Sequence, residues 1–313
     1  MTQHFDVVVI GGGPAGLSAA LNLVRARMRV LVLDANRPRH SATLFAHGFL
    51  TRDNISPLEL RRLGREDVSA YENGEVQFAA VDAVTALPDG YRVVARGVKG
   101  HPDRDVHARR IVVATGLAEI LPDIGNARAF YGTCLHSCLE CDGWEKQDAP
   151  LVLIGESEDL ALQAFRALQW TNDLLVLTNG AAVIDEAEER ELAASGIRLE
   201  RTPIDEITGE RGVMTGLVLA DGRALTYRAG FIRPRWEVRL GFLDPLGLDA
   251  DGDGLLIVDE RGRASRPGVY AAGDIVPPGP QQIAIAAGHG AVASATIVDD
   301  DVRERRAFGT RPV

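Results

Sequence analysis

The chain has 313 residues, of which 46% are hydrophobic and 25% are charged. These proportions are ordinary for a folded globular protein, and the length predicts two domains. The formal net charge of −10 at pH 7 argues against nucleic acid or an anionic membrane as a partner. No apolar run is long enough to span a bilayer, and a strand-like segment begins so close to the N-terminus that no signal peptide fits before it. We therefore expect a cytoplasmic protein.

The first predicted element is a buried strand at residues 7–10, followed by a glycine-rich turn and a helical segment from residue 17. The turn has the pattern G-x-G-x-x-G in the strand-turn-helix context that dinucleotide sites require. Gly11 permits the tight turn, Gly13 lets the backbone approach a pyrophosphate, and Gly16 lets helix and strand pack closely. This segment predicts a dinucleotide-binding fold.

A second strand at residues 30–33 ends in Asp34. An acidic residue at this place can accept hydrogen bonds from the hydroxyl groups of an adenosine ribose. The flanking strands and the acid make the glycine pattern much more specific than it is alone.

The chain loses its periodicity between residues 36 and 54. A long loop after the second strand can cover a cofactor's ring system. His47 and Asn54 are candidates for contacting that ring, although both could instead be polar residues that only shape the loop. An amphipathic helix is then predicted at 57–70, strands around a turn at 76–94, and a buried strand at 110–116.

A C-x-x-C pair, Cys138 and Cys141, is followed directly by Asp142. This spacing lets the two sulfurs close a small ring, and it lowers the pKa of one thiol, so it indicates redox chemistry. Half of a zinc site is the alternative, but Cys134 and His136 stand too close to the pair to form a second set of ligands. Cys134 itself is expected to be a buried small hydrophobic residue rather than a redox group.

A second strand and turn at residues 151–161 begin like a nucleotide fold but then depart from it. Only Gly155 is in place, because Ser157 and Leu160 stand where the other two small residues belong. Glu156, Glu158 and Asp159 would face a pyrophosphate, and the repulsion between like charges would cost a few kcal/mol. No arginine follows the next strand, at 174–177, to hold a 2′-phosphate. A nicotinamide nucleotide site is therefore doubtful, and short strands at 197–232 are expected to complete this part of the chain.

Residues 249–260 satisfy the EF-hand calcium pattern literally. An EF-hand loop needs a helix on each side, whereas Pro245 and Gly247 precede this segment and residues 255–258 are predicted to form a strand. We expect a β-hairpin turn, and no metal site.

A late strand at residues 268–274 ends in Gly273 and Asp274, and a helix rich in small residues is predicted at 282–297. Gly288 and Gly290 lie inside that helix, where glycine is destabilising. Close approach to a planar flavin ring explains them, and tight helix packing is the alternative. The positive N-terminal end of this helix could stabilise a reduced, anionic flavin.

The order of these motifs resembles the low-molecular-weight thioredoxin reductases over essentially the whole chain. The resemblance implies an α/β fold with two Rossmann-like, three-layer ββα nucleotide-binding domains, the second inserted in the first. It implies an FAD-binding domain from residues 1–117 and 243–313, and an inserted domain from 118–242 that carries the C-x-x-C pair. A homodimer is implied as well.

The resemblance also implies roles for single residues. Cys141 would be the thiolate that contacts the flavin, Cys138 would exchange with the substrate, and Asp142 would carry the proton. Gly11, Gly13, Gly16 and Asp34 would bind the ADP part of FAD, and Asp274 the ribityl or phosphate part. The remaining candidates for FAD binding are Pro14, Ala15, His47, Asn54, Ala114, Thr115, Gly116, Gly273, Gln282 and Ile283.

The departures from the family lie in the second nucleotide motif, which suggests an enzyme that works without NADPH. Our first hypothesis is a dithiol oxidase that takes electrons from a small dithiol through FAD to dioxygen, although the oxidases that the resemblance includes usually carry histidine in place of Asp142. The second is a reductase of a thioredoxin-like protein that uses ferredoxin or an atypically bound NAD(P)H. The third is a flavin-containing redox sensor with little turnover.

Overall fold

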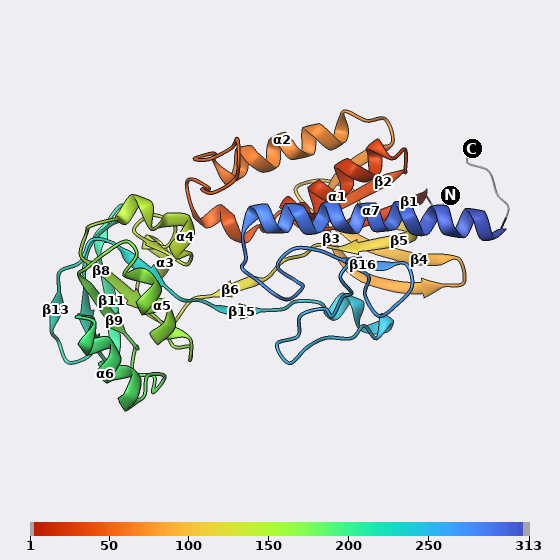
Figure 1. The fold of residues 1–313 in the computed structure, drawn as a ribbon. Coiled ribbons are helices and arrows are strands. Elements are labelled where there is room, and N and C mark those ends of the chain that lie inside the picture. Colours follow the sequence, from red (N-terminus) through yellow and green to blue (C-terminus); the bar gives the residue numbers. More distant parts are fainter. Residues whose placement is uncertain (1–2, 309–313) are drawn as a thin grey trace.

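The computed structural model describes residues 3–308, which form two lobes joined by a two-stranded ribbon (Figure 1). Segments from both ends of the chain build one lobe, drawn in red, orange and blue. The middle of the chain builds the other, drawn mainly in green and cyan.

The first lobe is built on a parallel sheet with the strand order β3, β2, β1, β5, β16. Strand β2 and the Val-Val-Val-Ile half of β1 are apolar and buried, as expected of a parallel sheet covered on both faces. The strands are β1 Gln3–Ile10, β2 Val30–Asp34, β3 Gly74–Leu87, β5 Arg104–Val113 and β16 Val269–Ala271.

Helices cover one face of this sheet and an antiparallel layer covers the other. The helices are α1 Pro14–Arg25, α2 Pro57–Ser69 and α7 Ile283–Phe308, and the opposite layer is made by β4 Gly90–Gly97 with the extensions of β3 and β5. Separate apolar clusters fill the two interfaces. The predicted three-layer α/β architecture is confirmed.

The second lobe repeats this plan on a smaller scale, with a parallel sheet in the order β10, β9, β8, β14, β7. The short strands predicted between residues 197 and 232 are present as β10 to β14. The elements are α3 Ala127–Phe130, β7 Leu135–His136, α4 Leu139–Asp142, β8 Leu151–Ile154, α5 Leu160–Ala167, β9 Leu174–Leu177, α6 Glu186–Ala194, β10 Arg198–Glu200, β11 Ile204–Glu210, β12 Val213–Leu219, β13 Ala224–Leu225 and β14 Gly230–Ile232.

The ribbon pairs β6 Ala118–Ile120 with β15 Arg235–Glu237 in antiparallel register. The predicted borders of the inserted domain, at 117/118 and 242/243, lie at or just beyond its ends; they remain a prediction. The remaining short helices are η1 Arg39–Ala42, η2 Trp144–Lys146 and η3 Gly241–Leu246.

The segment with the EF-hand pattern forms a turn. The Asp251 carboxylate accepts hydrogen bonds from the backbone of Asp253 and Leu255, and Ala250 bridges Leu256 in antiparallel fashion. The regular strand predicted at 255–258 is wrong, because only isolated bridges form there. Among residues 3–308, no group of three or more His, Cys, Asp or Glu side chains is placed to hold a metal ion.

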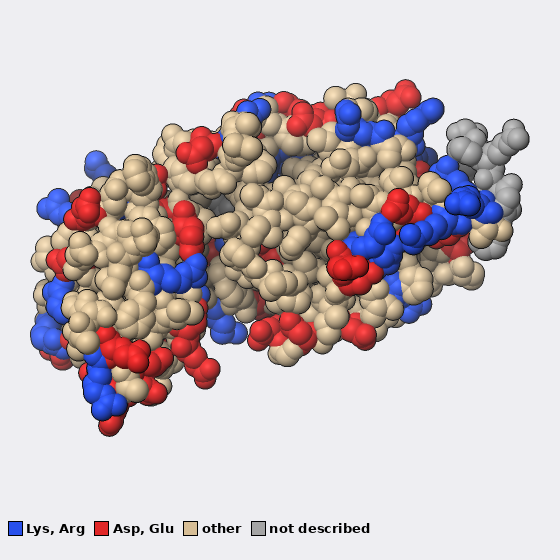
Figure 2. All heavy atoms as spheres, in the orientation of Figure 1, with Lys and Arg blue, Asp and Glu red and all other residues tan. Residues whose placement is uncertain are grey.

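Acidic and basic side chains are interspersed over both lobes on the face in Figure 2. Arg303 lies near the end of α7, is largely exposed and pairs with Asp300 of the same helix, whereas the nearby Arg305 pairs with the buried Asp301. Within the part of the chain that the structure describes, no helix has both the length and the apolar character needed to cross a membrane.

Candidate functional site

A cavity of about 460 Å³ runs from the first glycine turn to the C-x-x-C pair. This volume lies in the range of small-molecule binding sites. The cavity brings together most of the candidate residues, although they come from both lobes. The candidates in its lining are Gly11, Gly13, Pro14, Ala15, Asp34, His47, Ala114, Thr115, Gly116, Cys138, Cys141, Asp142, Gly273, Asp274, Gln282 and Ile283.

The three glycines of the turn face different surroundings. A Cβ atom on Gly11, whose φ is +115°, would lie 2.2 Å from the Ala114 carbonyl oxygen, and one on Gly16 would lie 1.9 Å from the Gly11 carbonyl oxygen. Both positions therefore require glycine for local packing. A Cβ on Gly13 would meet no atom within 4 Å, so this glycine leaves space open at the N-terminus of α1.

Asp34 ends β2 beside the glycine turn and is almost completely buried. Its Oδ2 atom lies 2.7 Å from Nη2 of Arg61, and its Oδ1 accepts a hydrogen bond from the backbone of Asn36. The sequence analysis missed Arg61, which is only 2% exposed although it lies on an amphipathic helix. The sequence signal that could have identified Arg61 is its place on the apolar face of the helix at residues 57–69.

The loop after β2 contributes His47 to the lining but not Asn54. Asn54 is exposed and has a left-handed backbone, with φ of 63°, which asparagine tolerates better than most residues. Its geometry fits the alternative of a loop-shaping residue. The His47 ring lies 3.7 Å from Glu145 of η2 and so approaches the other lobe.

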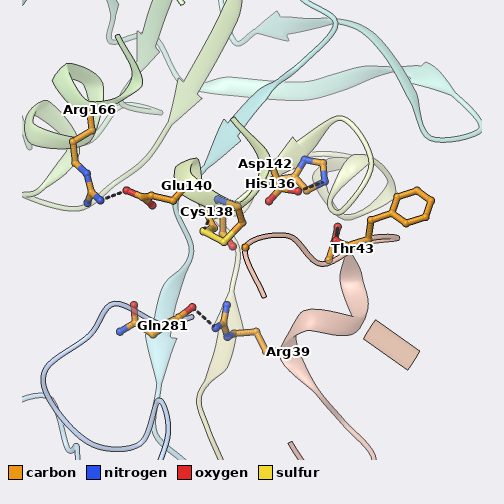
Figure 3. Close-up of a disulfide and its surroundings, with 12 residues drawn as sticks. Arg39, Thr43, His136, Cys138, Glu140, Asp142, Arg166 and Gln281 are labelled. Carbon is orange, nitrogen blue, oxygen red and sulfur yellow. Dashed lines mark hydrogen bonds and ion pairs between the residues drawn. A yellow bond between two sulfur atoms is a disulfide. The ribbon is translucent and has the colours of Figure 1, made fainter. Parts of the chain in front are cut away.

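Asp274 lines the cavity and forms an ion pair with Arg39, at 2.9 Å. The Arg39 guanidinium also donates to the Gln281 carbonyl oxygen, as Figure 3 shows, and lies 3.6 Å from Glu119 of the ribbon. Arg39 thus links the loop after β2, the segment before α7 and the ribbon. Its role was not visible in the sequence, because its partners lie far away in the chain.

The two glycines inside α7 differ. A Cβ on Gly290 would lie 2.1 Å from the Ala15 carbonyl oxygen of α1, so tight helix packing explains this residue. The flavin explanation is wrong for Gly290. Gly288 has open space where a Cβ would be, and α7 itself continues to Phe308, beyond the predicted end at 297.

Cys138 and Cys141 form a disulfide (Figure 3). Cys138 is the N-cap of the short helix α4, and its sulfur accepts a hydrogen bond from the Cys141 backbone. Glu140, between the cysteines, pairs with Arg166 of α5. The disulfide lies on the cavity wall, where a substrate sulfur and a bound ring could both approach it.

Asp142 and His136 lie side by side behind the disulfide (Figure 3). Burial raises the pKa of Asp142 to about 6, and the nearby Lys146 opposes this rise. Burial together with the Lys146 charge lowers the pKa of His136 to about 3. Near neutral pH the carboxyl group can therefore gain or lose a proton while the imidazole stays neutral.

Cys134 lies outside this arrangement. Its thiol donates to the Gly212 carbonyl oxygen at 3.1 Å, and its sulfur accepts from the Met214 backbone at 3.3 Å. It packs, half-buried, against an apolar cluster of the second lobe. These contacts agree with a packing role.

The second nucleotide-like turn, between β8 and α5, is occupied by its own side chains. Leu160 is fully buried, and its Cδ1 would lie 2.7 Å from a Cβ on Gly155. Asp159 pairs with Arg233 at 2.6 Å, and Glu156 accepts a hydrogen bond from Asn179, the residue two places after β9, at 2.6 Å.

Known proteins resemble this chain over nearly its whole length. Residues 5–290 match the family described as pyridine nucleotide-disulphide oxidoreductase. A solved Bacillus anthracis protein assigned as thioredoxin reductase TrxB is 35% identical, with a TM-score of 0.89 over 96% of this chain and 99% of that one. The structure of HlmI is 33% identical, with a TM-score of 0.86 over 99% of both chains. Thioredoxin reductase sirT of Leptosphaeria maculans is 28% identical over 88% of each chain.

Proposed function

Because the chain belongs to the pyridine nucleotide-disulphide oxidoreductase family, as a thioredoxin reductase-like FAD enzyme acting on sulfur, we propose that it is a dithiol oxidase. It converts a substrate dithiol into a disulfide without a bound nicotinamide nucleotide and passes the electrons to dioxygen. The observation that carries this proposal is the occupied turn between β8 and α5.

That turn lacks two of the three small residues of a nucleotide turn. At the first turn, a Cβ on Gly13 would meet no atom, whereas the equivalent position of the second turn carries the side chain of Ser157, and the third position carries Leu160, which packs beside Gly155. Glu156 and Asp159 add negative charge where a phosphate would have to bind. Arg233, the nearby cation, is already paired with Asp159. These contacts disfavour NADPH.

The residues of the large cavity fit FAD. The open positions at Gly13 and at Gly116, where a Cβ would likewise meet no atom within 4 Å, leave room for a ligand close to the backbone. Asp34 and Arg61 would lie at its adenosine end, and the disulfide at its ring end. When bound, FAD would accept two electrons from the reduced cysteine pair and deliver them to dioxygen as hydrogen peroxide.

The protein's own residues account for the sulfur chemistry. A substrate thiolate attacks the Cys138 sulfur, the bond between Cys138 and Cys141 breaks, and Cys141 leaves as a thiolate. The second substrate thiol then attacks the mixed disulfide, which releases the oxidised substrate and the Cys138 thiol. Asp142 takes a proton from an attacking thiol and returns it to a leaving sulfur. The sum is one dithiol and one dioxygen converted to one disulfide and one hydrogen peroxide.

An anaerobic titration of the flavin-loaded protein tests the proposal. We expect dithiothreitol to bleach the flavin absorption, whereas NADPH and NADH leave it unchanged. Admission of air should restore the colour with one hydrogen peroxide formed per flavin. Rapid bleaching by NADPH, or bleaching by dithiols without peroxide formation in air, would contradict the proposal.

A reductase of a thioredoxin-like protein, driven by ferredoxin or an atypically bound NAD(P)H, is the second candidate. Trp144, two residues after Asp142, is 70% exposed, and exposed aromatic side chains are common at protein interfaces. Turnover of thioredoxin with reduced ferredoxin, faster than oxidation of any small dithiol, would favour this candidate. As part of the proposal we also expect a cytoplasmic homodimer. Light scattering measures the molar mass of the purified protein and so tests for the dimer.

A further inference from the structure

We propose that His136 is a positioning residue for Asp142. Its imidazole holds the carboxyl group in place and stabilises the ionised form that accepts a proton during dithiol oxidation. This inference rests on the proposed function, and it adds a residue that lies outside the C-x-x-C-D motif.

The pair is formed by the fold rather than by the motif. His136 ends β7 and Asp142 ends α4, and the His136 Nε2 atom lies 3.4 Å from the Asp142 Oδ1 atom. Both residues are at most 9% exposed. Figure 3 shows the ring directed at the carboxyl group, next to the disulfide. A contact of this length is within the reach of a hydrogen bond that tightens when substrate binds.

The other ring nitrogen carries the second observation. His136 Nδ1 is shielded from solvent and makes no hydrogen bond of normal geometry among the described residues, although the Gly132 backbone still interacts with the ring and His136 lines the cavity. Nδ1 is closed off from the cavity, so a substrate does not reach it. His136 therefore acts on the reaction through Asp142.

Several charged groups surround the pair. Lys146 of η2 places its ammonium 3.4 Å from the Asp142 carbonyl oxygen. Glu145 of η2 and His47 of the loop after β2 also act on Asp142, with opposite signs. Because burial keeps His136 neutral, its ring has one N–H and one lone pair. One tautomer donates to the ionised carboxylate, and the other accepts from the protonated carboxyl group.

The proton balance involves Asp142 alone. The Asp142 carboxylate, held by the His136 Nε2–H, takes the proton of the attacking substrate thiol, and the imidazole remains neutral. The carboxyl group then delivers this proton to the leaving Cys138 sulfur. No net charge is left on the ring in either step.

The test uses the flavin-loaded protein and three variants. His136→Phe removes both nitrogens, and His136→Gln keeps an amide donor that cannot exchange protons. His107→Gln is the matched control, because His107 is equally buried, has an unpartnered Nδ1 and lies 3.1 Å from Asp89, but does not line the cavity. We measure anaerobic flavin bleaching by dithiothreitol from pH 5 to 9. The infrared band of the protonated Asp142 carboxyl group, identified with Asp142→Asn, gives its pKa independently of turnover.

We expect His136→Phe to raise the Asp142 pKa by about one unit, from about 6, and so to slow bleaching about twofold at pH 7 and nearly tenfold at pH 5, in proportion to the ionised carboxylate. His136→Gln should restore both the pKa and the rate, and His107→Gln should match the wild type. In an Asp142→Asn background, His136→Phe should have no further effect on the rate.

Wild-type pKa and rate in His136→Phe would overturn the inference, as would equal effects of the His107 control. A full additional loss in the Asp142→Asn background would also overturn it, because His136 would then act independently. These results leave the proposed function intact. Failure of the wild type to bleach with dithiothreitol would instead overturn the proposed function.

Discussion

Arg61 and Asp34 form a buried ion pair in which the guanidinium Nη2 lies 2.7 Å from the carboxylate Oδ2, and neither side chain is more than 8% exposed. The pair fixes Asp34 at the end of β2, where the adenosine part of FAD would bind. The same guanidinium bonds Asn36 and the Gly12 carbonyl oxygen, so it ties the glycine turn to the loop that follows β2.

Replacing Arg61 with leucine leaves the Asp34 carboxylate buried without its partner. We expect the free energy of unfolding at pH 7 to fall by about 3–5 kcal/mol, as measured by urea denaturation. Arg62→Leu is the control, because Arg62 is half-exposed and pairs only with Glu59 and Glu66 on the same helix. That change should cost far less than the loss of Arg61, because exposed ion pairs contribute little to stability. Equal losses in the two variants would contradict the importance of the buried pair.

Two alanine substitutions separate cofactor binding from packing at the glycine turn. Gly13→Ala adds a methyl group to open space, so the FAD-free protein should keep its melting temperature while FAD binds at least about tenfold more weakly. Gly16→Ala places the methyl group against the Gly11 carbonyl oxygen, so the FAD-free protein itself should lose stability. Calorimetry and fluorescence titration with FAD measure both effects. Unchanged FAD affinity in Gly13→Ala would mean that the pyrophosphate lies elsewhere.

Cys141→Ser breaks the redox pair without changing the shape of the cavity. Dithiol oxidation should fall by at least about a hundredfold, because a substrate thiol can no longer be exchanged for an internal thiolate. The protein should still bind FAD and remain yellow. Cys134→Ser is the control and should keep its activity, since this thiol bonds to the backbone of Gly212 and Met214 and does not line the cavity. Turnover in Cys141→Ser would contradict the proposed role of the disulfide.

Asp142→Asn should stabilise the protein at alkaline pH but not in acid. The folded carboxyl group has a pKa of about 6, raised by burial from 3.8, so the unfolded chain loses its proton first as the pH rises. The wild type therefore loses stability between about pH 4 and 6, by about 3 kcal/mol in total. Asparagine carries no such penalty.

The stability gain of Asp142→Asn should grow from near zero at pH 4 to about 2–3 kcal/mol at pH 8, as measured by denaturant unfolding. Asp105→Asn serves as the control, because Asp105 is exposed and a hydrogen bond from Arg92 lowers its pKa. It should show no gain at pH 8. A constant difference across the pH range for Asp142→Asn would show that burial does not govern this carboxyl group.

The fold and the redox pair could be predicted from the sequence because their signals are local. The glycine turn, the buried strands and the C-x-x-C spacing each lie within a few residues. His136 and Arg39 escaped prediction as site residues because their partners are assembled by the tertiary structure. Arg61 was hidden in a helix whose polarity suggested exposure. Residues 255–258 have strand propensity, but they form only two isolated bridges, one with Ala250 and one with Ala264.

The sheet of the first lobe joins segments that leave the ribosome at very different times. β1 and β5 emerge early, yet β16 must still pair with β5, and α7 must pack on α1 through Gly290. At bacterial and eukaryotic synthesis rates the intervening chain takes roughly ten to thirty seconds to make. The second lobe, which is continuous in sequence, can fold during this interval. The cavity, whose lining includes Gly273, Asp274 and Gln282, is therefore complete only when translation is nearly finished.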